Sequence, residues 1–355
     1  MTQAETDAST DRMPAPRGPV ALVYSAHAGS ARGARPQALL EAVGVSVGLA
    51  LPVADLDGAG ALGRAWRAAG CVAVVAAGGD GTVGAVARHA AEADLPLGVL
   101  PLGTANDIAR AFRIPMAPAA AARVIANGAL RWLDAGEVVP LPGDGNASGD
   151  YFLHAMTLGL NVEFARRATN VARRQIWGKL TYIISAVESL EYLRAVPVTL
   201  RFRGMPGQPE GNSVVVETAT TLLMAVNLPV IGGRLGLRLA GIHHDDHLLD
   251  LIVVEAPEPA GAGAALVAAL DALAGAARLL GGAPDGVADG GAQAAWYPAG
   301  VALPGARWYR ARSAEITTAE PVDLTLDGEL RGRTPALARV APRGVWMIAP
   351  GVATG

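Results

Sequence analysis

The segment Ala76–Thr82, which reads Ala-Ala-Gly-Gly-Asp-Gly-Thr, contains residues suited to binding a phosphate group. It follows the apolar run Cys71–Val75 and leads into a helix-like stretch. Glycines let the backbone turn tightly with its N–H groups pointing inward, and the positive end of the helix dipole favours an anion. The expected phosphate-binding residues are Gly78, Gly79, Asp80, Gly81 and Thr82.

A P-loop or a protein-kinase loop does not explain this segment. Lys179 is the only lysine of the chain, and the Gly178-Lys179 pair lacks both the upstream glycine-rich loop and the following Ser or Thr. Backbone N–H groups, and not a lysine, would therefore hold the phosphates.

A second turn of the same kind follows the apolar run Leu97–Leu100 and reads Pro101-Leu102-Gly103-Thr104-Ala105-Asn106-Asp107. Asn106 or Asp107 is expected to cap the helix that begins there. One glycine-rich turn is a weak signal, because many such turns only connect packed elements. Two in series, each with an Asp and a Thr, favour a nucleotide site.

The two turns resemble those of the diacylglycerol kinase catalytic family, which includes bacterial soluble lipid kinases and sphingosine kinases and is more distantly related to NAD kinases. The first turn is common to all these relatives. The second turn and Asp327-Gly328-Glu329 point to the lipid kinases. The likeness covers most of the chain through Val20–Gly29, Asp134–Gly136, Tyr151–Gly159, Asp245–Asp250 and Arg312–Pro335.

Two domains are expected. Apolar runs alternate with Ala-rich stretches over residues 19–140, which predicts an α/β domain with an open parallel sheet whose ligands bind at the carboxyl ends of the strands. Residues 341–355 are expected to return to this domain, and residues 1–18 to form a disordered tail. Residues 141–340 predict a largely antiparallel lipid-substrate domain. The resemblance implies a β-sandwich there, with the active site in the cleft between the domains.

The composition of this chain of 355 residues limits the kinds of partner that it is expected to bind. A hydrophobic content of 51% indicates a globular protein, and the net charge of −3 gives no general attraction to nucleic acid. The most apolar stretch, Pro259–Ala283, is interrupted by Asp271 and Arg278, so no membrane span is expected. Cys71 is the only cysteine, which fits a cytoplasmic protein without disulfides.

The resemblance implies roles for further residues. Ser25 and Gly29 would belong to the first nucleotide loop, and Thr104 would add a hydroxyl near ATP. Asp134 would help to position Mg²⁺ and phosphate. Glu329 would be the general base that takes the proton of the lipid hydroxyl. Without the family, Asp327-Gly328 is simply the commonest hairpin turn signal.

The run His243-His244-Asp245-Asp246-His247 contains three imidazoles and two carboxylates. The resemblance implies a structural Mg²⁺ held by the Asp246 side chain and the carbonyls of His243 and Leu248, a ligand set suited to a hard cation. A Zn²⁺ site and a loop without metal are the alternatives.

The chain departs from the family at several places. Ser25-Ala26 replaces the usual Asn-Pro of the first nucleotide loop, and Gly84-Ala85 stands where relatives usually have Asn and Glu. These changes leave Asp80, Thr104, Asp134 and Glu329 in place but alter contacts expected around ATP.

The function that we expect is transfer of the γ-phosphoryl of ATP to a lipid hydroxyl, with diacylglycerol as the first candidate. A sphingosine-type kinase, an NAD-kinase-like enzyme and a catalytically weak lipid-binding relative are the alternatives. Peripheral contact with a membrane would involve basic residues beside Trp177 and Tyr182; a homodimer is compatible with the sequence. These basic residues are Arg166, Arg167, Arg173, Arg174 and Lys179.

Overall fold

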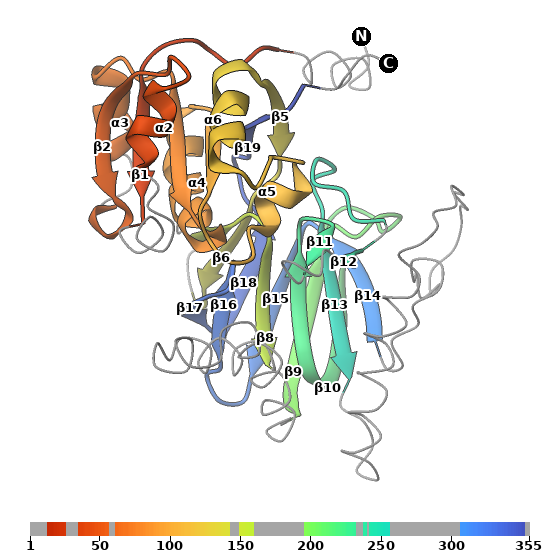
Figure 1. The fold of residues 1–355 in the computed structure, drawn as a ribbon. Helices are drawn as coiled ribbons and strands as arrows, with labels where there is room; N and C mark the ends of the chain where they lie inside the picture. Colours follow the sequence, from red (N-terminus) through yellow and green to blue (C-terminus); the bar gives the residue numbers. More distant parts are fainter. Residues whose placement is uncertain are drawn as a thin grey trace, which may run out of the picture.

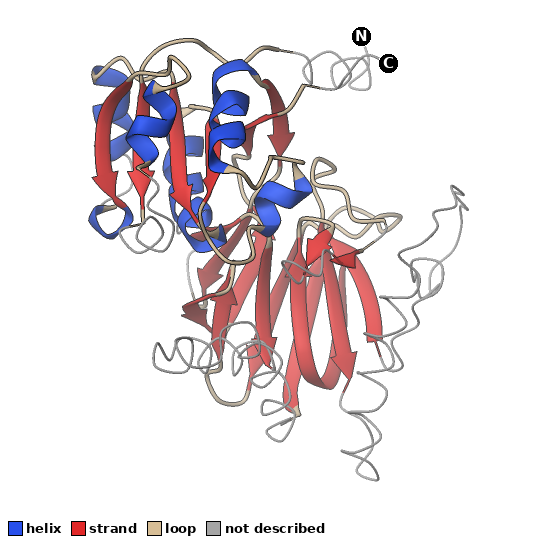
Figure 2. Ribbon diagram, in the orientation of Figure 1, coloured by secondary structure: helices blue, strands red, loops and turns tan. Residues whose placement is uncertain are grey.

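The computed structural model describes residues 13–25, 35–56, 61–142, 149–159, 195–231, 237–239, 241–255 and 306–351. These residues form an α/β unit and an antiparallel β unit that lie end to end (Figure 1; Figure 2). The apolar stretch Pro259–Ala283 and the basic residues from Arg166 to Lys179 fall outside the described residues.

The α/β unit is built on sheet A, whose strand order is β2-β1-β3-β4-β19-β5. The first four strands are parallel, and β19 runs parallel to β4 and antiparallel to β5. Apolar side chains on both faces of β1, β3 and β4 are buried, as is typical of a parallel sheet covered by helices. The strands are β1 (Val20–Tyr24), β2 (Val47–Pro52), β3 (Ala73–Gly78), β4 (Leu97–Pro101), β5 (Ala129–Leu133) and β19 (Val345–Ala349).

Helices pack beside this sheet in two pairs, with α3 next to α4 and α2 next to α6. Between α3 and α4, the ring of the fully buried Trp66 meets that of His89 edge-on, with ring centroids 6.2 Å apart. The helices are α2 (Pro36–Glu41), α3 (Ala61–Ala68), α4 (Asp80–Ala93), α5 (Asp107–Ala111) and α6 (Pro118–Asn127), with a 3₁₀ turn η2 (Val53–Asp55).

The β unit is an antiparallel sheet B that has eleven strands among the described residues. The long strand β10 pairs over its first half with β9 and over its second half with β8 and β13. The sheet therefore curls round one core, in which Phe152, Met156 and Phe202 are fully buried. Its strands are β6 (Gly136–Pro140), β7 (Asp150–Phe152), β8 (Ala155–Gly159), β9 (Val196–Arg203), β10 (Ser213–Val226), β13 (Leu249–Glu255), β14 (Ala306–Ala311), β15 (Ser313–Thr318), β16 (Asp323–Leu326), β17 (Glu329–Arg333) and β18 (Ala336–Val340). A short ribbon of β11 (Val230–Ile231) and β12 (Leu237–Arg238) lies beside it.

The predicted fold class is confirmed: a mostly parallel α/β unit precedes an antiparallel β unit, and the expected sandwich is a single curled sheet close to a barrel. The domain boundary and the end of the N-terminal tail differ from the expected positions. The chain changes sheet between β5 and β6, before the expected boundary at Leu141. Residues 13–15, expected in a disordered tail, run along β5, where the Leu130 N–H donates to the Met13 carbonyl at 2.9 Å.

In the part of the chain that the structure describes, no helix has the length and apolar character that crossing a bilayer requires.

Strand β19 should be essential to the α/β unit, because it fills the gap between β4 and β5. Truncation after Gly344 would remove the buried Met347 and Ile348, each worth roughly 1.5–3 kcal/mol of burial. It would also leave β5 without its pairing strand and β4 as an unprotected edge of the sheet. We expect loss of cooperative thermal unfolding in this variant. Truncation after Gly351, which keeps β19, is the control and should unfold like the full chain. Cooperative unfolding of the variant truncated after Gly344 would show that β19 is not essential to the α/β unit.

Candidate functional site

The first glycine-rich turn joins β3 to α4. Gly79 is the N-cap residue of α4, and no side chain caps this end. The first N–H groups of a helix have no partner within the helix, so those of Asp80, Gly81 and Thr82 suit an anion. Ser25, at the carboxyl end of β1, lies at the same edge and donates its N–H to the Ala77 carbonyl at 3.0 Å. Gly29 lies outside the described residues.

The second turn packs directly against the first. A methyl group on Gly103 would come within 2.3 Å of Gly79 Cα, so only glycine fits this close approach of two backbones. The Asn106 side chain closes the second turn through two hydrogen bonds to the Gly103 backbone, each 3.0 Å long. Thr104 is exposed on this turn. The structure therefore brings the two predicted turns together at one edge of sheet A.

Asp80 links the two turns, because its Oδ1 accepts the N–H of Ile108 in the first turn of α5 at 2.9 Å. Asn106 is the N-cap residue of α5, one of the two residues expected there, but its side chain makes no cap hydrogen bond. Its backbone is left-handed with φ 55°, and its side chain bonds Gly103 instead. Asp107 is buried within the helix. Asp80 thus holds the two turns together.

Asp327 and Gly328 form the tight turn between β16 and β17. Both residues have positive φ angles, 49° and 85°, as a type I′ hairpin turn requires. The buried Asp327 carboxylate accepts three backbone N–H groups, from Leu153 at 2.9 Å, His154 at 2.8 Å and Ala155 at 3.1 Å. Burial raises the pKa of this carboxyl, and the three hydrogen bonds oppose that rise.

The hairpin lies against the first turn of α4. Gly81 and Gly84 are three residues apart and so face the same side of the helix. A methyl group on Gly81 would come within 2.2 Å of Glu329 Oε1, and one on Gly84 within 2.3 Å of Asp327 Oδ2. The carboxylate of Glu329 therefore lies beside the glycine-rich turn, although 248 residues separate Glu329 from Gly81 in the sequence.

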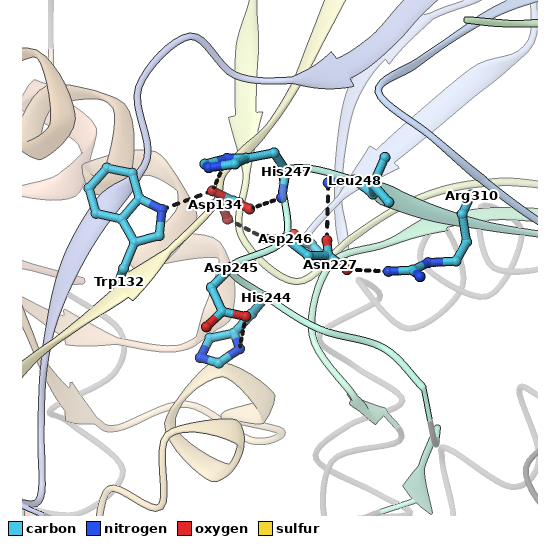
Figure 3. Close-up of polar contacts among 9 residues, drawn as sticks. All are labelled: Trp132, Asp134, Asn227, His244, Asp245, Asp246, His247, Leu248 and Arg310. Atoms are coloured by element: carbon cyan, nitrogen blue, oxygen red, sulfur yellow. Dashed lines mark hydrogen bonds and ion pairs between the residues drawn. The ribbon is translucent and has the colours of Figure 1, made fainter. Parts of the chain in front are cut away.

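Asp134 stands where the chain crosses from β5 to β6, and it is only 2% exposed. Its Oδ1 accepts the indole N–H of Trp132 at 2.9 Å and lies 3.0 Å from His247 Nδ1, while Oδ2 accepts the His247 N–H at 2.6 Å (Figure 3). The Asp134 N–H donates to the His244 carbonyl at 2.7 Å. Both carboxylate oxygens are thus engaged by the protein itself.

The loop at His243–Leu248 does not fit the Mg²⁺ site that the resemblance implies. Asp246 Oδ1 accepts the Leu248 N–H at 3.1 Å, and its Oδ2 forms an ion pair with Arg310. Among the described residues, no group of three His, Cys, Asp or Glu side chains could hold a metal ion. Nearby, burial raises the pKa of Asp250 to about 6, against the lowering effects of Trp308 and Arg310.

Several residues lie near the site without any sequence pattern that predicts their position there. Asn227 is fully buried and donates from Nδ2 to the carbonyls of Asp134 at 2.5 Å and Leu153 at 3.1 Å. Arg310 comes from β14, far along the chain from Asp246. His154 is half-buried, and its Nε2 lies 2.7 Å from the Val230 carbonyl oxygen.

A surface hollow of about 230 Å³ lies at the other end of α4, where Asp94, Trp132, Arg343 and Trp346 are among its lining residues. Asp94 follows the last residue of α4, whereas the phosphate turn precedes the first. This hollow is therefore distinct from the candidate phosphate site.

The comparisons with known proteins agree with this geometry. Residues 19–138 match the family model of the diacylglycerol kinase catalytic domain. A probable lipid kinase YegS-like of Pseudomonas aeruginosa strain PAO1 is 30% identical over 269 residues, which cover 75% of this chain and 73% of that protein. The chain belongs to the diacylglycerol kinase catalytic domain family.

Other relatives match over less of their length. A diacylglycerol kinase of Mycobacterium tuberculosis strain H37Rv is 31% identical over 191 residues, which is 53% of this chain and 56% of that protein. The chain spans about half the length of this and similar curated relatives. The crystal structure of a putative diacylglycerol kinase from Bacillus anthracis has the same fold, with a TM-score of 0.62, 20% identity and coverage of 97% of this chain and 98% of that one.

Replacement of Gly81 or Gly84 of α4 by alanine should affect the stability of the protein differently. In Gly84→Ala the methyl group meets Asp327 Oδ2, which three N–H groups hold in place, so we expect the free energy of unfolding to fall by roughly 1–3 kcal/mol. In Gly81→Ala it meets only the end of the exposed Glu329 side chain, which can turn away. Urea unfolding of both variants measures the difference, and equal stabilities would contradict the rigid contact at Gly84.

Proposed function

We propose that this protein is an ATP-dependent lipid kinase in which Glu329 is the general base. The observation that carries the proposal is the contact between the Glu329 carboxylate and Gly81 in the phosphate-binding turn. A base for this reaction must stand near both the γ-phosphoryl group and the acceptor hydroxyl. Hairpin β16–β17 supplies a carboxylate at that place from the second unit of the fold.

The chemical step follows from this arrangement. The lipid hydroxyl oxygen forms a bond to the γ-phosphorus of ATP as the bond between that phosphorus and the bridging oxygen breaks, so ADP leaves. Glu329 takes the hydroxyl proton. The N–H groups of the first turn of α4 hold the phosphates, and Asp80 keeps the two turns in register.

Mg²⁺ bound with ATP would neutralise phosphate charge, as it does in other phosphoryl transfers. Such an ion needs only one or two protein carboxylates beside the phosphate oxygens, and Asp80 at the turn fits this requirement. We assign Asp134 to positioning, because protein donors already engage both of its oxygens.

For the lipid, we infer diacylglycerol, with phosphatidic acid as product. Support comes from relatives named diacylglycerol kinase, while others are named only as probable lipid kinases. A lipid substrate requires access to a membrane surface, so we also infer a cytoplasmic protein that contacts membranes peripherally, with the basic residues from Arg166 to Lys179 as the candidate contact. A sphingosine-type substrate remains the alternative within the same chemistry.

Glu329→Gln tests the base. Glutamine keeps the size of the side chain but cannot accept the proton, so kcat should fall by about 10²–10⁴-fold while the melting temperature stays unchanged. The assay is transfer of labelled phosphate from ATP to a panel of lipids in mixed micelles with Mg²⁺. Glu320→Gln, at an exposed position outside the site, is the matched control.

Three outcomes of that assay would contradict parts of the proposal. Full activity of Glu329→Gln would exclude Glu329 as the base. Product from a long-chain amino alcohol alone would replace diacylglycerol by a sphingosine-type substrate. Lipid binding by the wild type without any product would favour a non-catalytic relative.

Gly81→Ala should separate stability from activity. Its methyl group displaces the Glu329 carboxylate from the turn, so kcat should fall at least tenfold without a loss of melting temperature. A fully active Gly81→Ala variant would show that the contact between Glu329 and Gly81 is not needed.

A further inference from the structure

A cationic side chain from β14, the guanidinium of Arg310, already lies beside Asp246 in the loop at 243–250. Asp246 and Asp250 both approach the guanidinium group of Arg310. Asp246 Oδ2 forms an ion pair with it (Figure 3), and Arg310 Nε lies 3.2 Å from Asp250 Oδ1. We propose that Arg310 takes the place of the structural divalent cation in this chain, so that the loop at 243–250 is organised without a bound metal ion.

The strand pairing fixes Arg310 in this position. Asp250 of β13 and Arg310 of β14 are direct partners across the antiparallel pair, where opposite charges stabilise each other. Asp250 is fully buried, and the indole N–H of Trp308 donates to its Oδ1 at 2.8 Å. A buried carboxylate needs such partners, because an unpaired charge in the interior is costly. The planar guanidinium suits this bridge, since it can donate to two carboxylates at once.

The same contacts occupy the Asp246 oxygen atoms that a metal ion would need as ligands. Mg²⁺ requires six oxygen ligands in nearly octahedral geometry at about 2.0–2.1 Å. Asp246 brings the only carboxylate of the ligand set that the resemblance implies, and it gives one oxygen to Arg310 and the other to the Leu248 N–H. A divalent ion at Asp246 would have to displace the guanidinium first.

Arg310 also acts on Asp134 through this loop. The residue next to Asp246 is His247, whose N–H donates to Asp134 Oδ2 and whose backbone has φ 57°. The guanidinium therefore helps to hold the donors that orient Asp134 where the chain crosses between the sheets. This inference concerns the stability of the loop and does not rest on the proposed kinase activity.

The test uses the full-length protein without nucleotide. Melting temperatures are compared in EDTA, in millimolar Mg²⁺ and in millimolar Ca²⁺, for the wild type and for Arg310→Met. The wild type should melt at the same temperature in all three. Arg310→Met should melt several degrees lower in EDTA, because the buried Asp250 and the partly buried Asp246 lose their cationic partner, and should recover part of that loss in Mg²⁺ or Ca²⁺.

Two further variants make the result specific. Arg307→Met removes an arginine of the same strand that pairs with Glu255 at 3.0 Å and is 55% exposed, so it should change little and respond to neither ion. The double variant Asp246→Asn/Arg310→Met should lose the response to metal. If Arg310→Met does not fold, Arg310→Lys replaces it, because lysine keeps the charge but lacks the planar guanidinium that lies against both carboxylates.

Three results would overturn the proposal. The first is a wild-type melting temperature that rises in Mg²⁺ without nucleotide. The second is one equivalent of divalent metal in wild-type protein purified without chelator. The third is an Arg310 variant that gains no stabilisation from either ion.

Discussion

The buried carboxylate of Asp327 is the interaction on which the rest of the site depends. It accepts three consecutive backbone N–H groups from residues 153–155 and thereby fastens the β16–β17 hairpin to the start of β8. Because Asp327 is the first of the only two residues in this turn, the position of Glu329 follows directly from this anchor. The hairpin then lies against two glycines of α4, which have no side chains to push it away.

A second anchor lies where the chain crosses between the sheets. Asp134 receives donors from Trp132 and His247, and Asn227 binds the Asp134 carbonyl. The loop that supplies His247 is in turn held by Arg310. Asp134 therefore joins the two units, because its carboxylate accepts the indole N–H of Trp132 from sheet A and the N–H of His247 from the β unit.

Local signals in the sequence predicted the parts of the site that depend on backbone conformation. The glycine-rich turns and the Asp-Gly hairpin are such signals, because a tight turn restricts residue types within a few positions. The contact of Asp327 with Gly84 could not be predicted, and Gly84 looked only like the loss of an asparagine. Arg310 and Asn227 were missed for the same physical reason, since pairing across distant strands leaves no spacing pattern. The residue type of Asn106 predicts its place as the N-cap of α5, but not that its side chain bonds Gly103 and leaves the helix N–H groups uncapped.

A double-mutant cycle of Asp327→Asn and Glu329→Gln tests the central claim most directly. Asparagine cannot accept all three N–H groups, so the hairpin should shift and kcat for phosphoryl transfer from ATP should fall. If Asp327 acts by positioning Glu329, the loss from Asp327→Asn should nearly vanish in the Glu329→Gln background. Additive losses in kcat, measured well below the melting temperature of each variant, would show that Asp327 does not act through Glu329 and would contradict the account.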